Sequence, residues 1–185
     1  MTNSHYEKLD GIERCIDDEI PFEIPDNWCW TRLANIIQLQ SGQDLTPDKY
    51  NDNKSGIPYI TGASNINAET VIINRWTTHG RAFAYKGDLL ITCKGTVGTM
   101  AFLEQEKVHI ARQIMAVNTH REINKYYLRM VLETHVSNLK ATAKSMIPGI
   151  SRDDVLLSLF PIPPIEEQHR IVSTYNSLLP YIEQL

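Results

Sequence analysis

The apolar residues of the chain fall into short runs between polar turn formers, a pattern that predicts a protein built mostly from β-sheet. Trp28 and Trp30 stand two positions apart, and apolar residues continue to Leu39, which predicts a strand or a helix-to-strand passage ending near Ser41. β-branched and aromatic residues dominate "IPYITGASNI" and "TVIINRWTT". The stretch "GDLLITCKGTVGTMAFL" predicts two strands joined around residues 94–98.

Helical spacing first appears after residue 122, where "INKYYLRMVLETHVSNL" predicts a helix of about four turns. The positions that recur at this spacing are Ile123, Tyr127, Met130, Val131 and Thr134. Two loops flank the sheet and the helix: a run of turn formers at 42–56, and a basic, hydroxyl-rich segment at 140–155. Ser151 and Asp154 in the second loop resemble a capping box.

A second helix is expected to follow a short apolar strand and a proline hinge at the C-terminus. Pro164 suits the first helical turn, and the two glutamates after it suit the positive end of the helix dipole. The seam spacing of a coiled coil joins Ile171, Tyr175, Leu178, Ile182 and Leu185. Pro180 should kink this helix. The alternative is an amphipathic helix packed on its own domain.

Length and composition favour one well-buried core with an appendage, since the chain has 185 residues, of which 42% are hydrophobic and 22% charged. No apolar run is long enough to cross a bilayer, and the first 26 residues lack the apolar core of a signal peptide. Three cysteines without metal-type spacing favour reduced thiols and a cytoplasmic location.

The charges are unevenly distributed although the net charge is only -4. Residues 1–26 carry eight acidic and two basic side chains, whereas residues 75–144 carry eleven basic and five acidic ones, a local excess of +6. The N-terminal stretch is interpreted as an extended, acidic linker. The basic middle is compatible with a surface that faces DNA.

The glycines, threonines and lysine of "CKGTVG" raise the possibility of a nucleotide-binding loop, but the order of residues excludes it. A phosphate loop places lysine after its second glycine and at the start of a helix, whereas Lys94 precedes both glycines and a strand follows. A tight turn between two strands explains the glycines. Metalloprotease, thiol-pair, nucleophile-elbow, methyltransferase and nuclease motifs are all missing, so we expect no catalytic residues and no metal site.

Four motifs in this order resemble a target-recognition domain of type I restriction-modification specificity subunits. They are "PFEIPDNWCWTRLANI", "GIPYITGASNI", "GDLLITCKGTVGTMAF" and "IPGISRDDVLLSLFPIPPIEEQHRIV". The resemblance covers about residues 20–185, and the last motif is its most specific part. It implies an α+β fold, with a mostly β-sheet recognition domain at 27–163, preceded by the linker at 1–26 and followed at 164–185 by the start of a long coiled-coil-type helix.

The resemblance also implies a noncatalytic subunit that reads double-stranded DNA and directs methylation and cleavage by partner subunits. Modification and restriction subunits are the expected partners, and S-adenosylmethionine, ATP and Mg are expected on them. Family members usually carry two recognition domains, so one domain here indicates an excised piece, a truncated frame, or a half subunit that pairs with a second copy. The alternative function is a protein-interaction module that acts through the C-terminal helix without reading DNA.

Loops rich in lysine, arginine, asparagine, serine and threonine supply the candidate DNA contacts, because these side chains bind phosphates and base edges. The candidates are Lys94, Thr96, Thr61, Ser64, Asn65, Arg81, Lys140, Lys144 and Ser145. Lys94 is expected to bind a backbone phosphate, whereas Thr96 and Asn65 are expected to influence which sequence is chosen.

Overall fold

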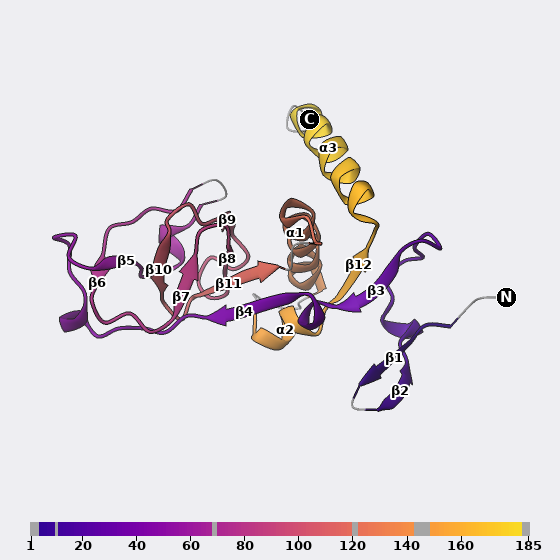
Figure 1. The fold of residues 1–185 in the computed structure, drawn as a ribbon, viewed down its shortest axis with the longest axis horizontal. Helices are drawn as coiled ribbons and strands as arrows, with labels where there is room; N and C mark the ends of the chain where they lie inside the picture. The colour runs from indigo at the N-terminus through magenta and orange to yellow at the C-terminus, as the bar shows by residue number, and fades with distance from the viewer. Residues whose placement is uncertain (1–3, 10, 68–69, 120–121, 143–148, 183–185) are drawn as a thin grey trace.

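Two four-stranded sheets form the centre of the molecule in the computed structural model, which describes residues 4–9, 11–67, 70–119, 122–142 and 149–182 (Figure 1). The first sheet has the order β6-β5-β10-β7 and the second the order β4-β11-β8-β9. Their strands are β4 (Ile37–Ser41), β5 (Ile57–Ile60), β6 (Trp76–Thr77), β7 (Phe83–Tyr85), β8 (Leu89–Thr92), β9 (Met100–Phe102), β10 (Lys107–Ile110) and β11 (Ile114–Thr119). Pairing within both sheets is antiparallel except between β5 and β10.

The two sheets enclose an apolar core between them. Ile60 of β5 and Val108 and Ile110 of β10 belong to the same buried cluster as Leu90 of β8 and Ile114 of β11. Each of these side chains is fully buried. The strands predicted within 57–66 and 87–103 are therefore confirmed as β5, β8 and β9, whereas β7, β10 and β11 were not predicted from the sequence. The inward-facing positions of both sheets meet in one layer.

The other face of the second sheet packs against helix α1 (Lys125–Thr142). Leu89 and Ile91 of β8 point into this second core, whereas Leu90 between them points into the first. Because β8 is covered on both faces, its side chains do not alternate between apolar and polar, which explains its continuous apolar run. The result is three layers: sheet, sheet and helix.

Helix α1 confirms the predicted helix, and four of the five positions picked out by helical spacing belong to the core or pack against it: Ile123, Tyr127, Met130 and Val131. Leu128, Leu132 and Val136 are buried at intervals of four residues, together with Tyr127. Thr134, the fifth of these positions, is exposed and donates its hydroxyl to the Met130 carbonyl at 3.0 Å. The apolar side of α1 is therefore wider than the predicted positions, because it also includes the buried Leu128 and Leu132.

A smaller antiparallel pair, β3 (Cys29–Arg32) with β12 (Leu159–Ile162), joins the segment before the two sheets to the segment after α2. The short helix α2 (Arg152–Leu156) precedes β12 and begins with the predicted capping box. The Ser151 hydroxyl accepts a hydrogen bond from the Asp154 amide at 3.1 Å, and the Asp154 carboxylate accepts one from the Ser151 amide at 2.7 Å. The predicted capping box is therefore confirmed, but the loop predicted at 140–155 is shorter than expected, because α1 continues to Thr142 and α2 begins at Arg152.

The acidic N-terminal segment is not an extended linker where it is described, because it forms a hairpin of β1 (Tyr6–Leu9) and β2 (Ile12–Cys15). Arg32, which is buried, holds the hairpin against the domain. Its guanidinium contacts Glu7 at 2.8 Å and Glu19 at 2.7 Å, and it donates to the Leu157 carbonyl at 2.6 Å. The hydrogen bond from Arg32 lowers the pKa of Glu7 to about 2.

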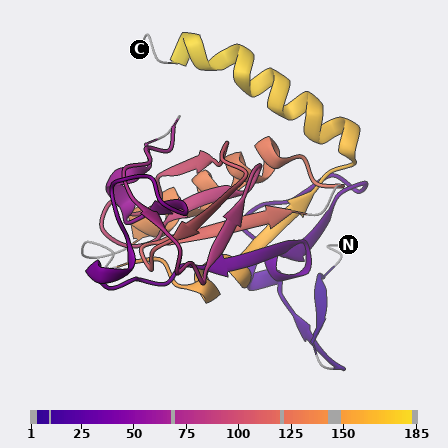
Figure 2. The ribbon, with the colours of Figure 1, turned by 60° about the vertical axis from the view of Figure 1, so that its left-hand side comes forward.

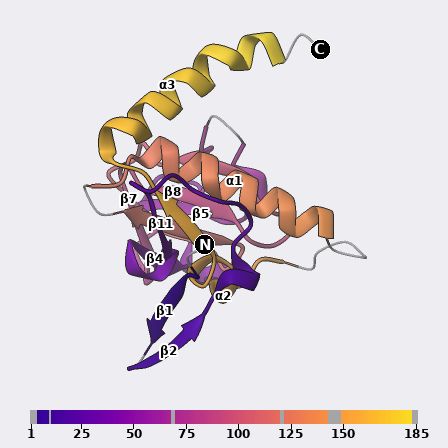
Figure 3. The ribbon, with the colours of Figure 1, turned by 90° about the vertical axis from the view of Figure 1, so that its right-hand side faces the viewer.

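Helix α3 (Ile165–Ile182) leaves the domain beside α1, and its far end stands clear of the sheets in all three ribbon views (Figures 1, 2 and 3). The hairpin β1–β2 lies on the opposite side of the molecule from α3 (Figure 3). The helical conformation continues through Pro180, so this proline does not end the helix. Within the described residues, no helix combines the length and hydrophobicity needed to span a membrane.

Candidate nucleic-acid interface

The turn between β8 and β9 presents two predicted contact residues on the surface. Gly95 and Gly98 have positive φ angles of 78° and 82°, which confirms that glycine is used here for backbone conformation. The buried Thr92 fixes the turn from below: its carbonyl accepts the Gly98 amide at 2.7 Å, and its hydroxyl donates to the Thr96 carbonyl. Lys94 and Thr96 are consequently exposed on a backbone that is internally hydrogen-bonded.

This turn packs against the end of α1, which brings a third predicted residue beside it. A Cβ atom added to Gly98 would lie 2.4 Å from Cγ1 of Val136 and 3.2 Å from Nζ of Lys140. Residues distant in sequence therefore place two exposed lysines, Lys94 and Lys140, around one turn. The Ile150 amide donates to the Cys93 carbonyl at 2.8 Å, so the chain leading to α2 borders the same turn.

The loop after β5 carries three more of the predicted residues, and one of them is not on the surface. Thr61 is half-buried and Ser64 is exposed, but Asn65 is only 3% exposed. The Asn65 Oδ1 atom accepts hydrogen bonds from the Thr61 hydroxyl at 3.0 Å and the Gly62 amide at 3.2 Å. Its Nδ2 atom donates to the Ile72 carbonyl at 2.9 Å and to Oδ1 of Asn74 at 3.3 Å.

These four bonds use all the donors and acceptors that an asparagine amide offers. The prediction that Asn65 contacts a base is therefore wrong for this conformation, and its side chain shapes the loop instead. Sequence reasoning placed Asn65 on the surface because asparagine between a strand and a polar segment is typical of an exposed turn.

The loop and the turn lie side by side. A Cβ atom added to Gly95 would lie 3.8 Å from Cβ of Ala63. Gln113, in the short connection between β10 and β11, contacts both segments: its Oε1 atom accepts the Ala63 amide at 3.1 Å, and its carbonyl accepts the Cys93 amide at 2.8 Å. Sequence reasoning did not single out Gln113, because nothing in its local pattern signals a contact with two distant loops.

Arg81 lies near this loop and turn, beyond the end of β10. The Ile110 amide donates to the Ala82 carbonyl at 3.0 Å, and the Ala111 amide donates to the Ile60 carbonyl at 2.9 Å. The end of β10 therefore separates Arg81 from Thr61, a spacing of roughly 10 Å for two adjacent strand pairs. Arg81 is exposed and flanks the cluster instead of joining it.

We call the surface formed by Thr61, Ser64, Lys94, Thr96 and Lys140 the polar edge. Arg81 borders it, Asn65 lies beneath it, and Lys144 and Ser145 lie outside the described residues. Hydroxyls and lysine amines on a backbone held by buried hydrogen bonds can contact phosphates and base edges. Burial raises the pKa of the neighbouring Cys93 thiol, which therefore stays protonated and unreactive at neutral pH.

No cluster of three or more histidine, cysteine, aspartate or glutamate side chains suited to a metal ion occurs in the part of the chain that the structure describes. His109 is fully buried beside Tyr59, and burial lowers the pKa of its imidazole. Its Nδ1 atom lies 2.9 Å from the Ala82 carbonyl oxygen and 3.2 Å from the Ala82 amide nitrogen, so this side chain contacts the backbone directly before β7.

The predicted seam on α3 is partly turned inward and partly exposed. Ile171 packs against the core, whereas Tyr175 is 39% and Leu178 is 50% exposed. The Ile182 side chain and Leu185 lie outside the described part of the chain. The start of α3 is fixed by Gln168, which is 1% exposed, accepts the Asn124 amide at 2.8 Å and donates to the Pro163 carbonyl at 2.9 Å.

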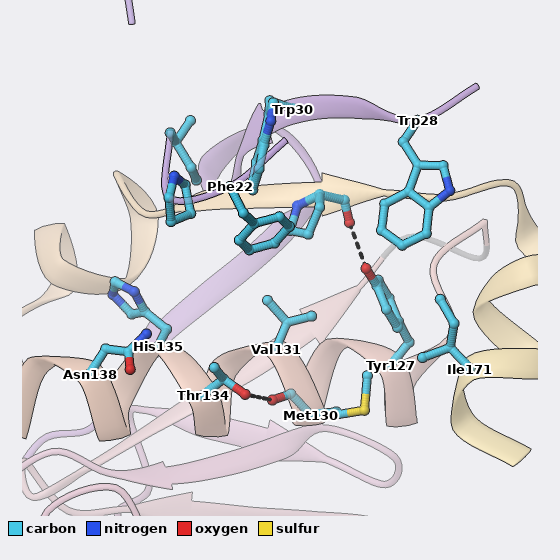
Figure 4. Close-up of a pocket in the computed structure, with 13 residues that line it drawn as sticks. Phe22, Trp28, Trp30, Tyr127, Met130, Val131, Thr134, His135, Asn138 and Ile171 are labelled. Atoms are coloured by element: carbon cyan, nitrogen blue, oxygen red, sulfur yellow. Dashed lines mark hydrogen bonds between the residues drawn. The ribbon is translucent and has the colours of Figure 1, made fainter. Parts of the chain in front are cut away.

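An apolar cavity of about 310 Å³ lies where α3 meets the domain (Figure 4). Phe22 and Trp30 line it on one side, and Tyr127 and Val131 of α1 face them from the other. The Tyr127 hydroxyl donates to the Pro161 carbonyl at 3.0 Å and ties α1 to β12 at the cavity wall. Ile171 also lines the cavity, so α3 departs from an apolar junction between the N-terminal segment, β12 and α1.

Comparison with known proteins matches residues 25–183 to a family model described as the type I restriction modification DNA specificity domain. The chain is 24% identical to the type I restriction enzyme EcoAI specificity subunit of Escherichia coli, over 91% of this chain and 31% of that protein. It is also 24% identical to the putative type I restriction enzyme MjaX specificity subunit of Methanocaldococcus jannaschii, over 87% of this chain and 39% of that protein. The chain thus spans about a third of the length of these curated relatives.

Solved structures share the fold. The HsdS subunit from Thermoanaerobacter tengcongensis superposes with a TM-score of 0.77 at 23% identity, covering 89% of this chain and 40% of that one. The S subunit of a type I restriction-modification system from M. genitalium superposes with a TM-score of 0.57 at 15% identity, covering 88% and 42%. The predicted fold class, a mostly β-sheet domain followed by a helix, is confirmed.

Proposed function

The chain belongs to the family of type I restriction modification DNA specificity domains, and from this premise we propose that it reads a double-stranded DNA sequence as part of a type I restriction-modification complex. In this role the chain performs no catalysis. It directs methylation and cleavage by modification and restriction subunits, on which S-adenosylmethionine, ATP and Mg act. The observation that carries the proposal is the polar edge, where loops from distant parts of the sequence present lysines and hydroxyls together.

Lys94 and Lys140 bind phosphates in this proposal. Both side chains are exposed beside one hydrogen-bonded turn, so an approaching backbone meets two positive charges at a fixed position. Phosphate contacts supply affinity and set the register of the protein on the duplex but carry no sequence information. Arg81, at the border of the polar edge, extends the same track.

Thr96, Ser64 and Thr61 contact base edges in this proposal. A threonine or serine hydroxyl donates and accepts hydrogen bonds, and the threonine methyl group packs against thymine. The Thr61 hydroxyl already donates to Asn65, so toward DNA it serves as an acceptor. Lys144 and Ser145, next in sequence to the end of α1, remain proposed contacts on sequence grounds.

Helix α3 links the domain to the rest of the assembly in this proposal. Its anchored start sets its direction, and the exposed Tyr175 and Leu178 continue the seam begun by Ile171. A second recognition domain or a second copy of the chain pairs along this seam, with Ile182 and Leu185 extending it. Two domains joined in this way read two halves of a split target.

The test is a methylome comparison between cells with and without the gene that encodes the chain, with the modification subunit present. We expect a discrete set of sites that lose methylation when the gene is deleted and regain it on complementation. A complementing variant with Lys94 and Lys140 replaced by glutamate should not restore methylation, because reversed charges repel the backbone. Full restoration by this variant would favour a protein-interaction module that acts through α3, and an unchanged methylome after deletion would refute the proposal.

A further inference from the structure

Gln113 occupies a position where the two segments of the polar edge meet. It lies between β10 and β11, and its side chain is half-buried. Its Oε1 atom accepts the amide of Ala63, in the loop that carries Thr61 and Ser64. Its carbonyl accepts the amide of Cys93, directly before Lys94. One residue therefore hydrogen-bonds both to the loop with the hydroxyls and to the turn with the lysine.

Gly62 leaves the space that the Gln113 side chain needs. A Cβ atom on Gly62 would lie 2.7 Å from Oε1 of Gln113, closer than a carbon and an oxygen can approach. The φ angle of Gly62 is 178°, an extended conformation that any residue adopts, so glycine is required here for space and not for backbone conformation. Gly62 therefore provides the space in which Gln113 Oε1 can accept the Ala63 amide.

Asn65 holds the loop rigid, so the hydrogen bond between Gln113 and Ala63 fixes the position of the whole loop. Its buried side-chain amide forms hydrogen bonds with Thr61, Gly62 and Ile72. Movement of Ala63 would therefore move Thr61 and Ser64 with it. Base contacts depend on placement to within about 0.5 Å, whereas a lysine with a flexible stem follows a phosphate over a wider range. The distance between the loop and the turn therefore affects base contacts far more than phosphate contacts.

We propose that Gln113 is a positioning residue for DNA sequence discrimination, which sets the spacing between the base-contacting loop and the phosphate-binding turn without itself touching DNA. This inference rests on the proposed DNA-reading function. A residue that touches DNA would affect both the affinity for any duplex and the preference for one sequence. Gln113 should affect only the preference and leave the affinity for an arbitrary duplex unchanged.

Two substitutions break the contact by different means. Gln113→Met has a similar length but no acceptor for the Ala63 amide. Gly62→Ala keeps Gln113 but pushes its carboxamide away, at little cost to the fold because the displaced atoms are the end of a flexible side chain. Gln113→Glu retains an acceptor and should rescue sequence preference, although its negative charge lowers affinity for every duplex. Gln38→Met is the matched control, because Gln38 is exposed and lies at the end of β4 away from Gln113.

The probe is a pool of duplexes with a randomised centre, from which the full chain, assembled with the modification subunit, enriches its preferred motif. Affinities are then measured for one enriched duplex and for a shuffled duplex of equal composition. We expect Gln113→Met and Gly62→Ala to lower the ratio of these affinities by about tenfold, with unchanged affinity for the shuffled duplex and a cooperative thermal unfolding transition that shows the domain is still folded. Gln113→Glu and Gln38→Met should keep the enriched motif.

A ratio that stays at the wild-type value in either Gln113→Met or Gly62→Ala would overturn the positioning role while leaving the DNA-reading function intact. An equal loss of affinity for both duplexes would also overturn it, because that result describes a phosphate contact. Failure of the wild-type chain to enrich any motif would overturn both this inference and the proposed function. The three results are distinct in the same measurement.

Discussion

Replacing Lys94 and Lys140 by alanine removes two exposed positive charges, one within the turn between β8 and β9 and one beside it on α1. Each lysine that neutralises a phosphate releases condensed counterions, which changes the slope of log affinity against log salt by about 0.9. Two contacts therefore account for about 1.8 of the slope. Over a fourfold rise in salt, such as roughly 50 to 200 mM, the double variant should lose about twelvefold less affinity than the wild type loses.

Fluorescence anisotropy with a labelled duplex at several salt concentrations measures these slopes directly. Lys86→Ala is the matched control, because Lys86 is also exposed, pairs with Glu106 at 2.7 Å and lies before β8, at the end of that strand opposite the turn. The single variants should each change the slope by about half the double-variant value. An unchanged slope in the double variant, or an equal change in Lys86→Ala, would refute the assignment of Lys94 and Lys140 as phosphate contacts.

Three further predictions concern base contact, pH and the core. Thr96→Val, which removes an exposed hydroxyl, should alter the motif selected from a randomised duplex pool while leaving the salt slope intact; an unchanged motif would remove Thr96 from the base contacts. Glu7 contributes stability above its ordinary pKa of 4.5 that is lost as pH falls toward about 2. Denaturation midpoints between these pH values should therefore fall less steeply in Glu7→Gln, and identical pH profiles would contradict the role of the Arg32 contact. Leu132→Ala should lower the free energy of unfolding by about 2–5 kcal/mol, whereas the exposed Ser137→Ala should change it by no more than about 0.5 kcal/mol in denaturant titrations.

The turn at residues 94–98 shows how far local pattern carries a prediction. Two apolar runs around glycines predicted paired strands, and β8 and β9 pair with Gly95 and Gly98 at positive φ. The order of the lysine and the glycines in the sequence was enough to exclude a nucleotide-binding loop. The conclusion needed no tertiary contact, because the conformation of a tight turn depends on the residues within it.

Asn65 and the N-terminal hairpin show where local pattern fails. Asparagine in a polar loop predicts exposure, but the return of the chain at Ile72 buries Asn65 and uses its amide. The acidic composition of the first 26 residues predicted a linker, but the buried guanidinium of Arg32 binds Glu7 and Glu19 and holds the hairpin. In both cases the deciding partner is a residue outside the local window.

The sequence by itself determined strands β5, β8, β9 and β12, helices α1 and α3, the capping box at Ser151 and the resemblance to specificity subunits, because each follows from periodicity and motifs within a short segment. Only the tertiary structure decided that Lys140 lies beside the turn of Lys94, that α1 buries its leucine stripe, and that Gln113 joins the loop to the turn. These are contacts between segments far apart in the chain. They depend on how the sheets and the helix pack, which local hydrophobic periodicity restricts but does not specify.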